Sequence, residues 1–144
     1  AGMNGGGMGL QSAIEAIQDI CLTVSGVRAA PDYPPEAANV YPFVACYATT
    51  GAFRGGPAGV MTALHTIAVE IHVARKELPR DVAAVIPYGE LVAAALLTLP
   101  TLSGTVDTIR AGEGITYTFG GMAWGGQETV GWRLLVPVKI QSTL

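Results

Sequence analysis

Glu70 and His72 are the two residues in this sequence whose types and spacing best suit acid–base chemistry. Residues 62–74 alternate between apolar side chains and other types with a period of two, which predicts a strand. Residues two apart on a strand lie on one face, so the carboxylate and the imidazole are expected to be neighbours. The pattern is also typical of a polar stripe that faces solvent or a neighbouring subunit. We favour that second interpretation, because few other titratable groups are available to complete a catalytic site.

Metal and cofactor chemistry find little support in the remaining residues. His65 lies seven positions before His72, so on one strand the two imidazoles point to opposite faces and share no ion without other ligands. Cys21 and Cys46 form no CxxC pair, and we expect two small buried side chains. The sequence has no nucleophile elbow, zinc-protease helix, phosphate-binding loop or dinucleotide fingerprint. We therefore expect no enzyme activity, no catalytic residue, no cofactor and no metal site.

Three further groups of residues are candidates for contacts with a partner. The Gly-rich stretch at residues 50–60 places an aromatic side chain beside a cation, and a solvated loop is the alternative. A dense charge cluster follows the predicted strand. Such clusters are mostly solvated corners, although they can set the register between subunits. A tryptophan among glycines is also a candidate, since tryptophan is enriched at interfaces. With Glu70 and His72, the assembly candidates are Phe53, Arg54, Gly55, Gly56, Pro57, Arg75, Lys76, Arg80 and Trp124.

The composition excludes several classes of protein. The chain has 144 residues, of which 50% are hydrophobic and 13% are charged, and its formal net charge is -3. Disorder requires low hydrophobicity with high charge, and general nucleic-acid binding requires a basic excess, so neither fits. The longest apolar stretch, residues 91–99, is shorter than the roughly 20 residues that span a bilayer, and we expect no membrane protein. A poorly charged, glycine-rich surface instead suggests that partners cover part of it.

The beginning of the chain is predicted to contain one helix between two irregular segments. Residues 1–9 are rich in glycine and are expected to form a flexible N-terminal arm. Residues 10–24 repeat apolar side chains at spacings of three and four, which predicts an amphipathic helix. Residues 28–39 contain three prolines, so an extended linker is expected there.

A hairpin with a long connection is predicted next. Residues 40–49 read as a strand, and Pro42 places it at a sheet edge because proline cannot donate to a ladder. A loop of about ten residues, at positions 50–60, is expected to join it to the strand at residues 62–74. Hairpin loops are usually shorter, so a loop of this length suggests a functional role.

The second half of the chain is predicted to contain a helix and three strands. The helix spans residues 81–99, with an interruption at Pro87. Together with the first half, the order α–β–β–α–β–β–β predicts a single α+β domain at residues 10–144. In this fold two helices pack on one face of a mainly antiparallel sheet, as a single layer plus helices. The three predicted strands span residues 105–111, 115–119 and 129–140.

This layout resembles that of the tail terminator (tail completion) proteins of long-tailed bacteriophages. The resemblance covers residues 10–140 and rests on an ordered set of features. The proline-rich stretch APDYPPEAANVYPFVACY precedes the Gly-rich hairpin connection. The strand region HTIAVEIHVARKELPRDV follows, and then come the helix with PYGELVAAAL and the segment LSGTVDTI. The ending YTFGGMAWGGQETVGWRLLVPVKI has a Gly-bounded turn before a long last strand.

The resemblance implies a structural protein of the virion with no catalytic residues. Proteins of this family form a hexameric ring that caps the tail tube, ends its polymerisation and joins it to the head–tail connector. The implied partners are further copies of the chain, the tail tube protein, the connector or stopper protein, and genome DNA that passes through the channel without sequence-specific contacts. The implied location is the virion tail or neck, assembled in the host cytoplasm. Another neck or tube subunit, or a small ligand-binding or hydrolase domain using Glu70 and His72, remains an alternative.

Overall fold

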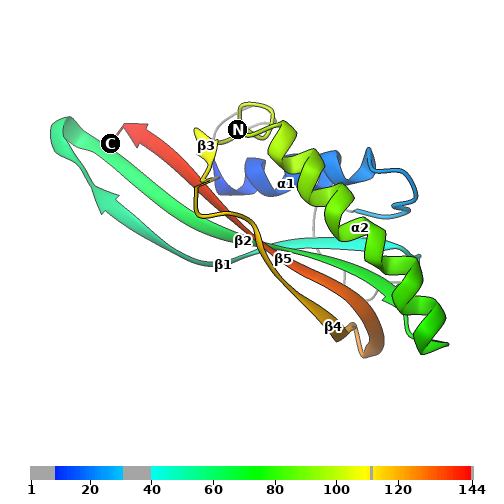
Figure 1. The fold of residues 1–144 in the computed structure, drawn as a ribbon. Coiled ribbons are helices and arrows are strands. Elements are labelled where there is room, and N and C mark those ends of the chain that lie inside the picture. Colours follow the sequence, from blue (N-terminus) through cyan, green and yellow to red (C-terminus); the bar gives the residue numbers. More distant parts are fainter. Residues whose placement is uncertain (1–8, 31–39, 111, 144) are drawn as a thin grey trace.

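The computed structural model describes residues 9–30, 40–110 and 112–143. Within these residues the elements follow the order α1, β1, β2, α2, β3, β4, β5, with a short 3-10 turn between β1 and β2 (Figure 1). The predicted α+β fold and its element order are confirmed. The predicted N-terminal arm at residues 1–9 and the proline-rich linker at residues 28–39 lie mostly outside the described residues.

All pairs of strands in the sheet are antiparallel. The central strand β2 (Val60–Ala74) lies between β1 (Phe43–Gly55) and β5 (Gln127–Thr143). On its other side β5 pairs with β4 (Thr116–Trp124) and with the short β3 (Thr108–Ile109). β1 is therefore an edge strand, as the proline before it predicted.

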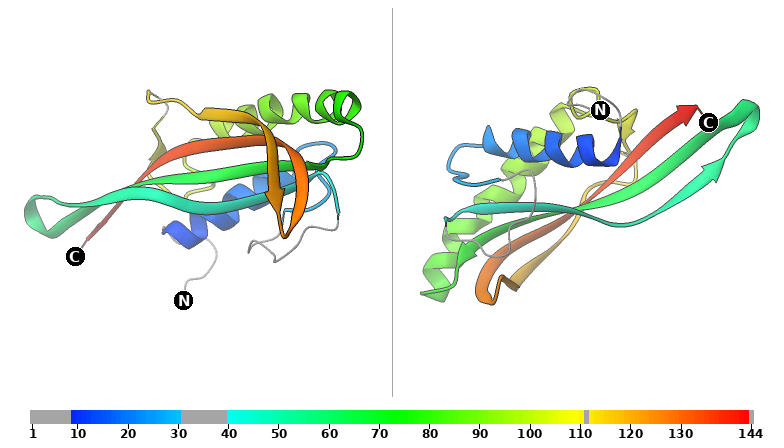
Figure 2. Two further views of the ribbon diagram at one scale, coloured as in Figure 1. Left: turned by 90° about the horizontal axis from the view of Figure 1, so that it is seen from below. Right: turned by 180° about the vertical axis from the view of Figure 1, so that it is seen from behind.

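The helices α1 (Leu10–Leu22) and α2 (Leu78–Thr98) lie on the same face of the sheet, as Figure 2 shows. No other helix longer than one turn occurs in the described part of the chain, so the opposite sheet face has no helical cover there. The apolar stripe predicted for the first helix is confirmed, because Ile14, Ile17 and Cys21 of α1 are buried.

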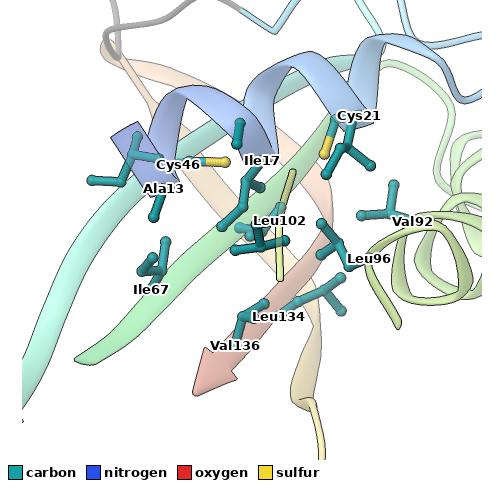
Figure 3. Packing of buried hydrophobic residues seen from close by; sticks show 14 of the residues in the cluster. Ala13, Ile17, Cys21, Cys46, Ile67, Val92, Leu96, Leu102, Leu134 and Val136 are labelled. Carbon is teal, nitrogen blue, oxygen red and sulfur yellow. The ribbon is translucent and has the colours of Figure 1, made fainter. Parts of the chain in front are cut away.

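The hydrophobic core fills the space between the two helices and the sheet (Figure 3). Burial raises the pKa of the Cys21 thiol to about 12, and it also raises the pKa of Cys46. Both cysteines are thus buried and protonated, as predicted. The residues labelled in Figure 3 are Ala13, Ile17, Cys21, Cys46, Ile67, Val92, Leu96, Leu102, Leu134 and Val136.

The prediction of a long loop between the first two strands is wrong. β1 continues to Gly55 and β2 begins at Val60, so only four residues are left for the turn. The two strands stay paired up to Gly55 and Met61. Glycine and small residues at 50–60 suggest a loop by composition, but their backbones are free to form ladder hydrogen bonds with β2.

The paired strands extend well beyond both helices (Figure 1). We call residues 48–61 the β-arm. Gly51 is required in it, because a Cβ at this position would lie 2.3 Å from the backbone oxygen of Leu64. Over the last eight residues of β1 every side chain is exposed, and eight residues of strand span about 25 Å.

The interruption predicted in the second helix is also wrong, since α2 runs through Pro87. Gly89, one helical turn after Val85, makes room for an aromatic side chain of β5. A Cβ at Gly89 would lie 2.3 Å from the indole of Trp132. Trp132 Nε1 donates a hydrogen bond to the carbonyl oxygen of Val85 at 2.9 Å, which ties the helix to the sheet.

α2 therefore buries one continuous face. An unbroken helix keeps its phase through Pro87, so Val85, Val92 and Leu96 share the inner face and have no exposed surface. The segment Pro79–Thr98 is long and apolar enough to cross a membrane by length and composition alone, but this inner face packs into the core. Three apolar residues of α2 are about half exposed: Ile86, Leu91 and Leu97.

The last three strands all differ from their predicted bounds, β5 (Gln127–Thr143) only by a short extension at each end. The strand predicted at residues 105–111 is reduced to the two residues of β3, because a series of turns precedes it. The strand predicted at residues 115–119 continues as β4 to Trp124, which thus ends a strand rather than lying in a loop. The turn itself is made by Gly125 and Gly126, both with positive φ.

Candidate functional site

Glu70 and His72 form the centre of a polar cluster on the sheet face opposite the helices. His72 Nε2 lies 2.9 Å from Glu70 Oε1, and His72 Nδ1 lies 2.6 Å from the hydroxyl of Thr129. Tyr47 donates its hydroxyl to the second carboxylate oxygen of Glu70, and Arg133 Nε lies 3.4 Å from that same oxygen. We call these five side chains the polar cluster. The predicted pairing of Glu70 with His72 on one face is confirmed, but the interpretation as a stripe that faces solvent or a neighbouring subunit is wrong, because both side chains are buried within the chain.

The strand register explains why residues far apart in the chain meet here. β2 is central, and Glu70 pairs with Ala45 on β1 and with Arg133 on β5. His72 pairs with Gly131 on β5, so Thr129 lies two residues further along on the same face. Three strands therefore contribute side chains to one patch.

The charges within the cluster are balanced. Burial raises the pKa of Glu70, but the hydrogen bonds from His72 and Tyr47 and the charges of His72 and Arg133 outweigh it, so the pKa is lowered overall. Burial and the hydrogen bond to Glu70 raise the pKa of Tyr47. At neutral pH Glu70 is thus a carboxylate and Tyr47 a protonated donor, and each group carries the charge that its neighbours favour.

Trp124 covers the cluster from the end of β4. Its ring centroid lies 5.7 Å from that of His72, 6.0 Å from that of Phe43 and 6.3 Å from that of Tyr47. β4 and β1 lie at opposite sides of the sheet, so the β4–β5 hairpin must curl back over this face, as Figure 2 shows. Under this cover His72 and Thr129 have no exposed surface.

The order hydroxyl, imidazole, carboxylate has the connectivity of a nucleophilic triad. The Thr129 hydroxyl is nevertheless buried, and none of the three cavities lined by described residues contains it, Glu70 or His72. Among the described residues, no group of three His, Cys, Asp or Glu side chains is placed to hold a metal ion. What the arrangement does is hold β1, β2 and β5 together through satisfied polar groups.

The tip of the β-arm is the second candidate region. Phe53 is 70% exposed, and its ring lies edge-on against the imidazole of His65 on β2, at a centroid distance of 5.4 Å. Arg54 is exposed and has no ion-pair partner among the residues that the structure describes. The assembly candidates at residues 53–57 thus lie together at the tip, apart from the polar cluster. The exposed candidates at the tip are Phe53, Arg54, Gly55, Gly56 and Pro57.

The charged candidates Arg75, Lys76 and Arg80 lie at a solvated corner where β2 ends and α2 begins. The carboxylate of Asp81 accepts hydrogen bonds from the backbone N–H groups of Lys76 (2.6 Å) and Glu77 (2.7 Å), which fixes the turn. Arg80 pairs with Glu77 at 3.4 Å, and Arg75 pairs with a carboxylate of β5 at 3.6 Å. Exposed pairs of this kind contribute roughly 0–1 kcal/mol.

Sequence reasoning missed three members of the polar cluster: Tyr47, Thr129 and Arg133. Alternation along the last strand places Thr129 and Arg133 off the apolar face, and this signal was available. The sequence does not predict that Tyr47 joins the cluster. The register of β1 against β2 depends on a short turn whose residues are typical of a long loop. In comparisons with known proteins, no family model and no curated protein matches the chain.

Proposed function

We propose that this chain is a ring-forming structural protein of a bacteriophage tail, a tail terminator that caps the tail tube and joins it to the head–tail connector. The observation that carries the proposal is the β-arm. Its outer strand extends past both helices with every side chain exposed. A monomer gains little stability from such an extension, whereas a ring subunit uses it to reach its neighbour.

Exposed apolar side chains on two other elements support the same proposal. α2 exposes Ile86, Leu91 and Leu97 on its outer face, and β4 exposes Tyr117 and Phe119. Apolar groups that gather on a surface typically mark contacts with other proteins. The tail tube protein and the connector or stopper protein would cover these side chains in the assembly.

Beyond a bulge in β1 between Ala48 and Thr50, the two outer strands of the sheet lack the usual protection against pairing with another chain. Arg54 is the single charged residue of β1, and β4 has none. Edge strands of monomers usually carry charges, prolines or bulges that prevent such pairing. Unprotected edges are typical of subunits that meet in an assembly.

The charge of the chain suits a channel through which genome DNA slides. The formal net charge is -3, and a strongly basic lumen would retain DNA through its phosphates. The proposed setting is therefore the virion tail or neck, with DNA as a passing partner.

The test is assembly of the purified full-length chain, measured by native mass spectrometry and negative-stain electron microscopy. We expect a closed ring whose mass is a multiple of the 14.8 kDa subunit, and we expect the ring to bind tube ends and stop their elongation. The control replaces residues 54–62 by Asn-Gly, so that Phe53 still pairs with Ala63 across a two-residue turn. This variant should fold and remain monomeric. A full-length chain that stays monomeric and leaves tube elongation unchanged would overturn the proposal.

A further inference from the structure

A groove lies between α1 and the segment that follows α2. Its volume is about 430 Å³. One side is a single face of α1, because the α1 residues that line it recur at spacings of three and four. Its apolar part comes from Ala16 and Ile20 on α1 and from Leu99 across the groove. Leu99 is 43% exposed, so an apolar side chain placed in the groove would find a partner on both sides.

Two carboxylates lie along the same groove. Glu15 and Asp19 are one helical turn apart, and both line it. α1 contains no lysine or arginine, and neither carboxylate forms an ion pair with any described residue. The partner that Glu15 has is the neutral amide of Gln11, at 3.1 Å. Like charges at this spacing destabilise a helix, and a cation bound between them would remove that cost.

The tip of the β-arm carries the complementary chemistry. Phe53 and Arg54 are adjacent on β1 and exposed, and the guanidinium has no ion-pair partner in the described residues. Neighbouring residues on a strand point to opposite faces. Because β1 is an edge strand, its edge can enter a groove with the aromatic ring on one side and the cation on the other.

We propose that the β-arm tip of one copy of this chain docks in the α1 groove of the next copy. Phe53 packs between Ile20 and Leu99, and Arg54 binds the carboxylates of Glu15 and Asp19. The arm and the groove are different surfaces, so the contact is heterologous and is repeated around a ring. This inference rests on the proposed function, since its occupant is a second copy, and it adds the contact that would hold neighbouring subunits together.

The test reverses the charge on each side of the contact in the full-length chain. Arg54→Glu alone and Asp19→Arg alone should each weaken assembly by a factor on the order of ten or more, because like charges then meet. Mixing the two variants in equal amounts should restore assembly. In alternating copies the reversed arm meets the reversed groove, and the native arm meets the native groove. Analytical ultracentrifugation of each variant and of the mixture measures this result.

The matched control is Glu90→Arg, which makes the same charge change at an exposed position of α2 outside the groove. It should assemble like the unmodified chain. If the unmodified chain forms a ring and both single variants do so equally well, the arm–groove contact is wrong and the ring proposal stands. The groove would then have another occupant, such as the tube protein. If the single variants fail and the mixture fails as well, the contact is also wrong. If the unmodified chain forms no ring, the ring proposal fails, and this contact fails with it.

Discussion

The polar cluster and the β-arm tip both lie on the paired strands β1 and β2, and the cluster also includes residues of β5. The two regions nevertheless differ in almost every physical property. In the cluster each charged group faces an opposite charge or a hydrogen-bond partner, and His72 is fully buried. At the tip Phe53 is 70% exposed, and Arg54 has no ion pair with a described residue. Tyr47 of the cluster and Phe53 of the tip lie only six positions apart on β1.

The difference in burial indicates separate roles for the two ends of the β1–β2 pair. The cluster joins three strands, so it fixes the base of the β-arm relative to the core. An extension from a fixed base holds its tip in one place, and a pre-organised tip loses less conformational entropy on binding. The buried end thus contributes stability to the fold, and we propose that the exposed end contacts other chains.

Removal of Glu70 should produce the largest loss of stability. Glu70→Ala leaves the buried imidazole of His72 and the hydroxyl of Tyr47 without their shared hydrogen-bond partner. Because each buried polar group left unpaired costs about 1–3 kcal/mol, we expect a loss of about 3 kcal/mol. Urea unfolding followed by circular dichroism measures the change. Glu128→Ala, which breaks an exposed pair with Arg75, is the control and should cost less than about 1 kcal/mol. Equal losses in the two variants would contradict the structural role of the cluster.

Truncation of one aromatic residue in each region should separate folding from assembly. Trp124→Ala uncovers His72 and Phe43, and we expect a loss of about 2 kcal/mol, less than for a fully buried tryptophan. Phe53→Ala removes an exposed side chain and should cost less than about 1 kcal/mol. Assembly should show the opposite order, with the larger defect at Phe53. Unfolding and sedimentation measurements on both variants check this. If the same variant has the larger defect in both assays, the two regions do not have separate roles in folding and assembly.

The fold class was predictable because its signals are local. Spacings of three and four place Ile14, Ile17 and Cys21 on the buried face of α1, and the alternation at residues 129–140 is confirmed within β5. The continuity of α2 through Pro87 was not predictable. Pro87 and Gly89 read as breaks, and only the tertiary contact with Trp132 shows why a glycine belongs there.

The candidate site was predictable only in part, for a similar reason. A period of two is enough to pair Glu70 with His72. The contacts with Tyr47, Thr129 and Arg133 depend on the register of three strands, and the cover by Trp124 depends on the curl of a hairpin. Sequence periodicity contains neither kind of information. The β-arm was hidden because its glycines are typical of loops.

Acid should weaken the cluster and leave the β-arm tip unaffected. The pKa of Glu70 is lowered in the folded protein from its ordinary value of 4.5, so the unfolded chain binds this proton more readily. The resulting stability is present above pH 4.5 and is lost as the pH falls through the lower folded-state pKa. Glu70→Gln should therefore lose less stability than the unmodified chain over this acidic range. Urea unfolding at a series of pH values tests this, and parallel pH profiles would contradict it.

A cysteine at the β-arm tip should have the smallest effect on stability. Its reactivity directly compares the exposed tip with the buried part of the chain. Gly55→Cys is suitable because a Cβ there meets no atom within 4 Å. In the monomer this exposed thiol should be alkylated quickly at pH 8. Cys21 should react orders of magnitude more slowly, because it is buried and its pKa is about 12. Mass spectrometry of the alkylated peptides separates the sites, and the native cysteines should react only after denaturation. Ring formation should slow alkylation at the tip, since the neighbouring copy would then cover it. If Gly55→Cys is alkylated as fast in an intact ring as in the monomer, the β-arm does not take part in the contacts between subunits.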